Sequence, residues 1–215
     1  MYRVVRAVNT FCVTDLSSLY LDALKDTLYT ERADAPRRRS AQTVLYDILV
    51  LLLKVTAPIL AFTVDEAWEH LTVREEDAPS VHLTRWPAPV VVADGPQLAA
   101  RWDRLVALRT DILKALEAAR AAGTIGSALE ARVIITAAST DECSQLTADR
   151  EALTILAIVS AVDVVAGTAG RTIQVQRAAG RKCARCWMFR TSVGRHSAHP
   201  ELCDRCMQVI TEAST

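Results

Sequence analysis

The chain has 215 residues, of which 51% are hydrophobic and 23% are charged. This balance is typical of a globular protein and excludes a wholly disordered chain. Lys and Arg together equal Asp and Glu at 25 each, so the net charge gives no sign of a nucleic-acid partner. The length has room for one large domain or for two to three small ones. The abundance of Ala, Leu and Val favours helix-rich packing.

The ends and the apolar runs of the chain bear on its compartment. The first six residues lack the continuous apolar core of a signal peptide. The apolar stretch 44–62 is interrupted by Asp47, Lys54 and Pro58 before it could span a bilayer. Cys12 and Cys143 stand alone, and unpaired thiols fit a reducing compartment. We therefore expect a cytoplasmic protein with no membrane partner.

Residues 1–82 are predicted to form a helical bundle. Apolar residues recur every three or four positions in the first 28 residues, as in an amphipathic helix or a closely joined pair of helices. Ser40 is predicted to cap a helix that starts at Ala41, whose apolar stripe is wide enough for a deeply buried position. Thr63 and Glu66 form a capping-box pattern that predicts another short helix.

The remaining chain is predicted to hold a connector, an α+β unit and a tail. Residues 83–96 form a Pro-rich connector, residues 97–180 a long helix with a small α+β unit, and residues 181–215 a metal-binding tail. β-branched runs predict strands at 133–135, 162–165 and 172–176, with a helix at 151–157. The tryptophans outside the tail are expected to anchor the core or the linker: Trp68, Trp86 and Trp102. The fold class is therefore mainly α.

Two Cys-x-x-Cys pairs near the C-terminus are separated by sixteen residues. Each pair lets one tight turn direct two thiolates at one metal, and two pairs complete a closed tetrahedral shell. This spacing predicts one structural zinc ion (Zn²⁺) with four ligands: Cys183, Cys186, Cys203 and Cys206. The alternative is redox use, although thioredoxin-like motifs carry a single pair beside a βαβ pattern. His196 and His199 could replace a thiolate, but four thiolates favour solvated loop histidines.

Basic residues are distributed unevenly along the chain. Residues 171–215 carry eight basic against three acidic residues, and four thiolates around a divalent metal subtract about two charges. A modest positive charge remains, which a solvated surface could carry without a partner. Arg37, Arg38 and Arg39 form the densest basic run. We predict that this run lies in a loop between helices, where it either binds phosphates or is only a solvated face.

Several segments of the chain carry motifs of a known family. Residues 9–22 read NTFCVTDLSSLYLD and residues 56–63 read TAPILAFT. Both segments resemble the anticodon-binding helical domain of class I isoleucyl-tRNA synthetases. The strings KCARCW at 182–187 and HPELCDRC at 199–206 resemble the zinc-binding tail of the bacterial form, and residues 114–120 and 125–131 resemble its linking region. The valine and leucine enzymes share the helical part but not this tail, which favours isoleucine.

The resemblance implies a partner and a division of labour. Residues 1–82 would be the anticodon-binding bundle, the partner would be the anticodon stem-loop of an isoleucine tRNA, and a separate catalytic portion could bind. The family is an ATP-using aminoacyl-tRNA ligase, but its His-Ile-Gly-His-type and Lys-Met-Ser-Lys-Ser-type motifs do not occur here. We therefore expect this chain alone to be non-catalytic. The alternatives are a free-standing RNA-binding accessory protein and a zinc-stapled protein-interaction module.

The resemblance also implies which side chains contact RNA. Arg185 and Trp187 flank Cys186, and they would supply a planar donor and a stacking platform for unstacked anticodon bases. The alternative for Trp187 is packing against the knuckle or a neighbouring helix. Further basic residues would add salt-dependent contacts to phosphates: Arg3, Arg6, Lys25, Arg37, Arg38 and Arg39.

Overall fold

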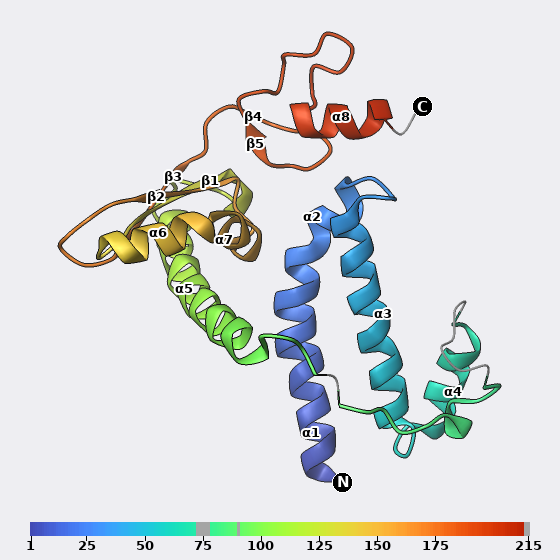
Figure 1. Ribbon diagram of the computed structural model, residues 1–215. Helices are drawn as coiled ribbons and strands as arrows, with labels where there is room; N and C mark the ends of the chain where they lie inside the picture. Colours follow the sequence, from blue (N-terminus) through green and yellow to red (C-terminus); the bar gives the residue numbers. More distant parts are fainter. Residues whose placement is uncertain (72–77, 90, 213–215) are drawn as a thin grey trace. The chain divides into compact units, whose positions relative to one another are not determined.

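The computed structural model describes residues 1–71, 78–89 and 91–212 (Figure 1). The chain divides into two compact units, one of Met1–Arg32 with Pro96–Thr215 and the other of Ala33–Gly95. Helices dominate both, and the predicted mainly α fold with a small α+β unit and a four-cysteine module is confirmed. The predicted divisions at 82, 96 and 180 stay a prediction, and residues 72–77, 90 and 213–215 within them lie outside the described residues.

The first unit begins with one continuous helical rod. It consists of α1 (Tyr2–Thr10), a π-helical stretch η1 (Phe11–Leu21) and α2 (Asp22–Thr30). The junction residues Phe11 and Asp22 keep right-handed helical angles, so the chain does not break between these elements. Of the two alternatives for this segment, the single helix is therefore correct. Within residues 1–30, all of which are described, only Thr27 and Thr30 are buried.

A small α+β unit follows in the same part of the molecule. A long helix, α5 (Gly95–Ala121), precedes the short turn η3 (Ala128–Glu130) and strand β1 (Ala131–Thr136). Two helices, α6 (Thr140–Ala148) and α7 (Arg150–Ala157), then lead to β2 (Ala161–Val165) and β3 (Thr172–Arg177). The strand order is β2-β1-β3, with β2 parallel and β3 antiparallel to β1. The three predicted strands and the helix near 151–157 are confirmed.

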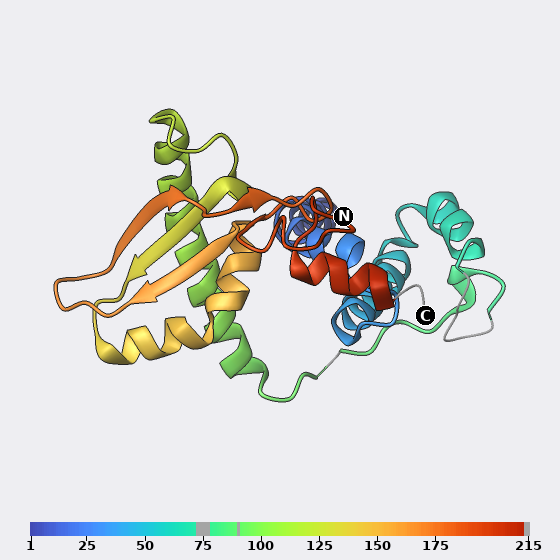
Figure 2. The same cartoon turned by 90° about the horizontal axis from the view of Figure 1, so that it is seen from above.

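The core of this unit lies between the sheet and its helices. Alternate residues of β1 are fully buried and pack on α5 and α7, as the two-residue period of a strand requires. Figure 2 shows α5 running across one face of the sheet. The shared cluster includes residues from all three elements: Val133, Ile135, Leu108, Ile112, Leu116, Leu153 and Leu156. Ser160, which is buried before β2, accepts a hydrogen bond from the Phe189 backbone N–H (2.7 Å) and donates one to the Leu129 carbonyl (2.5 Å).

The second unit is a smaller helical cluster. It contains α3 (Pro36–Thr56), α4 (Ala61–Glu69) and the single turn η2 (Val81–Leu83). Trp68, only 1% exposed, is the largest side chain of its core, and its indole N–H donates to the Ala78 carbonyl at 2.9 Å. Trp68 is therefore the core anchor that the sequence predicts. None of the described helices is long and apolar enough to cross a membrane.

Both predicted helix starts in this unit are wrong. α3 begins at Pro36 rather than at Ala41, because proline has the backbone angle of a first helical residue and no N–H to leave unpaired. Ser40 is therefore inside the helix and caps nothing. α4 begins at Ala61, before Thr63, and its N-cap residue Leu60 makes no side-chain cap.

Several apolar side chains lie on the surface where burial was expected. Val44 and Leu49 on α3 are each at least 40% exposed, so the deep position predicted for this helix is wrong. Trp86 and Trp102 are also exposed, at 69% and 41%, and do not anchor a core. The width of an apolar stripe shows how much surface a helix could bury. In the described part of the chain, neighbouring elements cover only some of the stripe on α3.

Candidate metal centre and nucleic-acid interface

The first Cys-x-x-Cys pair lies in a tight turn between two short strands, β4 (Arg181–Lys182) and β5 (Phe189–Arg190). The Cys183 N–H donates to the Met188 carbonyl at 3.0 Å, and the Trp187 N–H donates to the Cys183 carbonyl at 2.9 Å. Trp187 has a φ of 64°, in the left-handed region that non-glycine residues rarely adopt. The closed turn therefore contains a strained backbone conformation at Trp187.

The second pair lies where the last helix begins. Cys203 immediately precedes α8 (Asp204–Glu212), and Cys206 lies in its first turn. Both side chains are buried and lie in one cluster with the first pair. The helix thus fixes the direction of two sulfurs, as the knuckle does for the other two.

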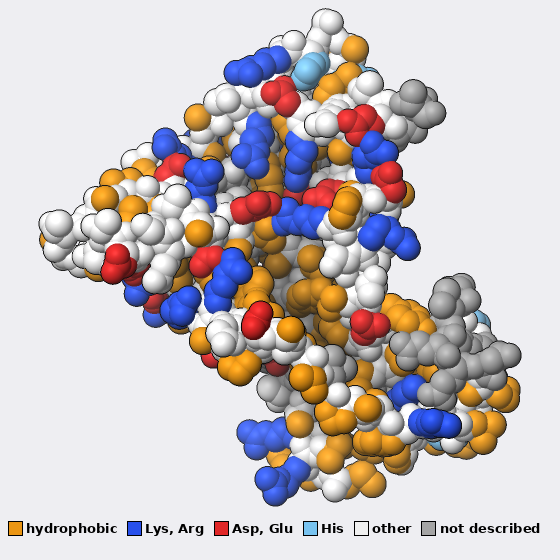
Figure 3. All heavy atoms as spheres, viewed as in Figure 1, with side chains coloured by type: hydrophobic (Ala, Val, Ile, Leu, Met, Phe, Trp, Pro, Cys, Tyr) orange, Lys and Arg blue, Asp and Glu red, His pale blue; other side chains and the backbone are white. Residues whose placement is uncertain are grey.

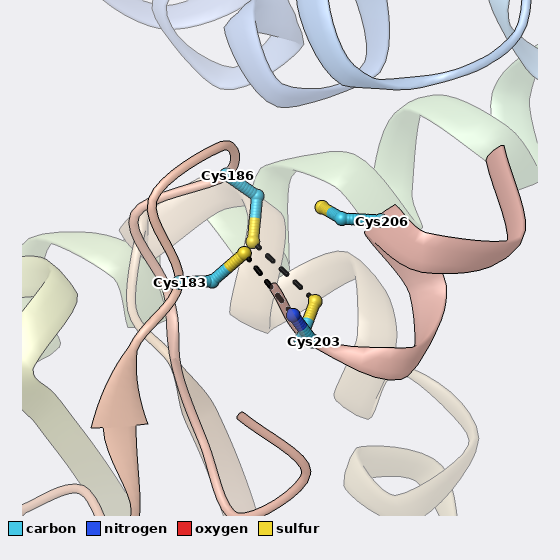
Figure 4. A group of neighbouring side chains, drawn as sticks. All are labelled: Cys183, Cys186, Cys203 and Cys206. Atoms are coloured by element: carbon cyan, nitrogen blue, oxygen red, sulfur yellow. Dashed lines mark hydrogen bonds between the residues drawn. The ribbon is translucent and has the colours of Figure 1, made fainter. Parts of the chain in front are cut away.

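The four cysteine sulfurs converge on one point (Figure 4). All four lie within 4.8 Å of one another, and the sulfurs of Cys186 and Cys203 are 3.9 Å apart. Zinc–sulfur bonds of about 2.3 Å in a tetrahedron put the sulfurs about 3.8 Å apart. A disulfide would need about 2.05 Å, and all four cysteines are free thiols. The cluster therefore fits a metal ion better than redox use.

The pKa shifts of the clustered cysteines also favour a metal ion. A hydrogen bond from the Cys206 thiol lowers the pKa of Cys186 to about 4, although burial opposes the shift. The pKa of Cys206 is raised, first by that same hydrogen bond, and burial raises the pKa of Cys203. One thiolate is thus stabilised while further negative charge is opposed. Four thiolates in this space require a cation among them.

The two histidines between the pairs lie outside the cluster. His196 Nε2 lies 2.8 Å from a carboxylate oxygen of Asp204, and His199 Nδ1 lies 3.7 Å from one of Glu201. Both side chains are partly exposed, at 37% for His196 and 45% for His199. The structure therefore gives neither histidine a place among the sulfurs, in line with the simpler interpretation of the sequence.

Three predicted RNA contacts meet at one pocket. A cavity of about 470 Å³ lies between α2, α7 and the first knuckle, and Lys25, Arg185 and Trp187 all line it. Trp187 is 58% exposed, and the Lys182 ammonium lies 5.2 Å from its ring centroid. The pocket was not predicted, because its walls come from segments that are far apart in the sequence.

The lining side chains already have partners within the chain. Arg185 donates through Nη1 to the main-chain oxygen of Thr30, and the same nitrogen lies 3.9 Å from the sulfur of Cys206. A guanidinium has five N–H donors, so one nitrogen leaves others for a ligand. Lys25 pairs with Asp22 at 2.6 Å, and the hydrogen bond to Asp22 raises the pKa of Lys25.

The other predicted contacts lie elsewhere. Arg3 and Arg6 are exposed on α1 and do not line the pocket. The Arg37–Arg39 run belongs to the second unit and occupies the first turn of α3, so its predicted loop position is wrong. Arg39 donates to the side-chain oxygen of Gln42 at 3.1 Å. Basic side chains at a helix N-terminus oppose the helix dipole, so the run gains nothing from its own helix.

The residues that hold the tail on α2 were missed. Arg205 of α8 donates Nη1 to Oδ2 of Asp26 at 2.5 Å and Nη2 to Oδ1 at 2.7 Å. The hydrogen bond to Asp26 raises the pKa of Arg205. Arg32 pairs with Glu212 at the other end of α8. No sequence pattern joins residues this far apart, and the one available signal was the position of Arg205 between two predicted ligands.

The surface around the tail carries both signs of charge. Figure 3 shows Lys and Arg side chains interleaved with Asp and Glu side chains over the tail and the neighbouring end of α2. Pairs such as Arg205–Asp26 and Arg195–Asp204 account for part of this alternation. A partner that binds here would therefore meet individual side chains rather than a uniform basic field.

Comparison with known proteins agrees with these features. Residues 180–209 match the family described as "Zinc finger found in FPG and IleRS", which with the four-sulfur cluster confirms the predicted zinc cofactor. The isoleucine–tRNA ligase of Exiguobacterium sibiricum is 45% identical over 96% of this chain and 23% of its own length. That of Geobacillus thermodenitrificans is 43% identical over 97% of this chain and 24% of its own length.

The chain thus spans about a quarter of the length of the curated relatives that it matches. The predicted resemblance to the C-terminal part of bacterial isoleucyl-tRNA synthetases is confirmed by these matches. Residues 1–135, more than half of the chain, match the family described as "Anticodon-binding domain of tRNA ligase". This chain belongs to the anticodon-binding domain family of tRNA ligases.

Proposed function

We propose that this chain is the anticodon-binding C-terminal portion of an isoleucine–tRNA ligase and that its partner is the anticodon stem-loop of an isoleucine tRNA. The two family matches and the relatives support this assignment. The enzyme as a whole would join isoleucine to that tRNA with ATP, in the cytoplasm. In this division of labour, the portion described here recognises the tRNA and the catalytic portion carries out the chemistry.

The observation that carries the proposal is the exposed Trp187 at the edge of the pocket. An anticodon loop offers unstacked bases, and an indole ring is a stacking surface for any of them. The metal-clamped knuckle holds this ring in place before binding, so little freedom is lost when a base stacks on it. Lys25 and Arg185 line the same pocket and would add donors for phosphate or base edges.

In this proposal the zinc ion has a structural role. It would be held by the four thiolates and would supply no open coordination position, so its contribution is the rigidity of the two knuckles. Every contact to RNA is then made by the side chains of the chain itself. Arg3, Arg6 and the Arg37–Arg39 run would add phosphate contacts that lack base preference.

A binding measurement tests the proposal. The chain should bind an isoleucine tRNA more tightly than the same tRNA with a swapped anticodon. Trp187→Ala should remove most of this preference, because stacking on an aromatic side chain is worth about 1–3 kcal/mol per base. A filter-binding titration at two salt concentrations measures both effects. Equal affinity for the two tRNAs that Trp187→Ala leaves unchanged would instead favour a non-specific RNA binder or a protein-interaction module.

The exposed apolar side chains support a protein partner as well. Val4 and Val5 on α1, Leu49 on α3 and Phe62 on α4 are between 42% and 92% exposed. A catalytic portion of the ligase would cover such side chains. We expect no isoleucine-dependent pyrophosphate exchange with this chain alone, and charging of an isoleucine tRNA when a separately produced catalytic portion is added. Exchange activity above a buffer control would contradict this assignment.

A further inference from the structure

The zinc tail contacts the end of α2 through two arginines, one from each Cys-x-x-Cys pair. Arg185, inside the first pair, donates to the main-chain oxygen of Thr30. Arg205, inside the second pair, donates both terminal nitrogens to the carboxylate of Asp26, at 2.5 and 2.7 Å. Paired hydrogen bonds between a guanidinium and a carboxylate fix orientation as well as distance. These bonds therefore fix the orientation of the tail relative to the end of α2.

The two groups that accept these hydrogen bonds, the Thr30 carbonyl and the Asp26 carboxylate, both lie in the last turn of α2. The Thr30 hydroxyl donates to the main-chain oxygen of Asp26 at 2.8 Å and to its carboxylate at 3.0 Å. The last four carbonyls of a helix lack partners within the helix, and this end carries partial negative charge. A carboxylate at the same end adds to that charge. The two guanidinium groups thus offset the negative charge that gathers at this helix end.

The buried residues of the rod lie in the turn of α2 that the two arginines contact. Thr27 and Thr30 are the buried residues of the 1–30 rod, and both lie in this turn. The Arg205 and Asp26 side chains are 40% and 26% exposed, so water screens their pair only partly. The tail therefore supplies polar partners to a turn of α2, a helix that also contacts α7.

The direction of each arginine depends in turn on the cysteines beside it. Each lies between two of the four converging sulfurs in sequence, and Nη1 of Arg185 is also 3.9 Å from the sulfur of Cys206. We propose that Asp26 is the docking residue for the zinc tail, so that metal binding by the four cysteines and ordering of the last turn of α2 are linked. Asp26 is a positioning residue, acting on the metal site through Arg205.

Docking has a consequence for the pocket at Trp187. One wall of that pocket is α2, including Asp26 and Thr30, and another is the first knuckle. When the tail leaves α2, these walls separate and the pocket is lost. Zinc thus shapes a surface to which it contributes no atom, because it keeps both arginines directed at one helix end.

Zinc release from the full-length, zinc-loaded chain tests the link without RNA. Excess chelator with a zinc-sensitive dye reports the rate. Asp26→Asn keeps the shape of the side chain and removes its charge, and we expect about fivefold faster release, the size of a strong partly exposed ion pair. The matched control is Asp163→Asn, which breaks the 2.5 Å pair with Arg132 on the sheet. That variant should release zinc at the rate of the unmodified chain.

A double-mutant cycle separates docking from a direct effect on the metal. Arg205→Gln changes a residue between two ligands and can disturb them by itself. If its contribution runs through Asp26, the Asp26→Asn/Arg205→Gln chain should release zinc no faster than Arg205→Gln alone. Added salt should also speed release from the unmodified chain and leave Asp26→Asn nearly unchanged. Additive effects of the two substitutions would overturn the proposal.

Hydrogen exchange measures the link from the other side. Removal of zinc should speed amide exchange in the last turn of α2, which contains no metal ligand, and leave residues 105–116 of α5 unchanged. Asp26→Asn should have the same effect with zinc still bound. An unchanged release rate in Asp26→Asn, or exchange in α2 that is insensitive to zinc removal, would overturn the proposal. Neither readout involves tRNA, so a failure of tRNA binding would leave this test intact.

Discussion

The Lys182 ammonium lies over the indole ring of Trp187, 5.2 Å from the ring centroid. Because Lys182 precedes the first cysteine of the knuckle and Trp187 follows the second, the closed turn brings the two together. A cation over an aromatic face is attracted to it, by about 0.5–1 kcal/mol at an exposed site. The contact favours this orientation of the ring while 58% of the residue stays exposed.

Fluorescence should report a base that stacks on this ring. Stacking on an exposed indole quenches its emission, so an isoleucine tRNA should quench the unmodified chain. Trp187→Phe should lose most of that quenching while the other three tryptophans still emit. The matched control is Trp102→Phe, which changes a tryptophan of α5 that is 41% exposed and outside the pocket. Equal quenching in Trp187→Phe and the unmodified chain would show that no base stacks there.

Purified chain should contain about one zinc ion per molecule, because a closed site with four thiolates is normally saturated. Cys186→Ser should lose the metal and unfold the tail. Most of the helical circular dichroism should remain, since the helices of the second unit and α5 have cores of their own. Cys143→Ser, which changes a cysteine outside the cluster, is the control. Substoichiometric metal in freshly reduced protein would contradict the assignment.

Neutralising Arg37, Arg38 and Arg39 together to Gln should weaken binding of any tRNA by a similar factor. Interactions with phosphate carry no base information, and removing each of them lowers the salt dependence of log K by about 0.7–0.9. Titrations of an isoleucine tRNA and its anticodon-swapped form at several salt concentrations measure this slope. A weakening confined to one of the two tRNAs would mean that the run reads sequence.

Gly180→Ala should destabilise the tail specifically. Gly180 has a φ of 92°, and a methyl group there would overlap the backbone of Arg190 and Thr191 in the β5 region. A left-handed backbone with a side chain costs on the order of 1–3 kcal/mol, and the overlap adds to it. We expect faster zinc release and a lower melting temperature. Gly95→Ala is the control, because its added methyl meets open space.

The features that depend on local chemistry could be predicted from the sequence. The spacing of the four cysteines sufficed for the metal cluster, and β-branched runs sufficed for the three strands. One helix, α6, was missed although its signal was present. Ser139 caps it by accepting from the Glu142 N–H, and Glu142 in turn accepts from the Ala138 N–H. This is close to a capping box, in a segment whose apolar period is weak.

The features that depend on tertiary contacts could not be predicted. Asp26 is one acidic residue among several on a helix surface, and only the folded tail gives it Arg205 as a partner. Both Pro36 and Ser40 are residues that can mark the start of a helix, and α3 begins at Pro36. The apolar stripe of α3 predicted burial, but a stripe does not say which surface covers it.

Ser160 connects the metal-binding tail to the sheet of the α+β unit. Its single hydroxyl joins the Leu129 carbonyl, just before β1, to the Phe189 N–H of the knuckle strand. The module beyond the segment between β3 and β4 is therefore attached at two places, to the sheet through Ser160 and to α2 through Arg205. Transplanting residues 181–212 onto another protein would carry the metal but lose this fastening. A functional graft would have to include the sheet as well.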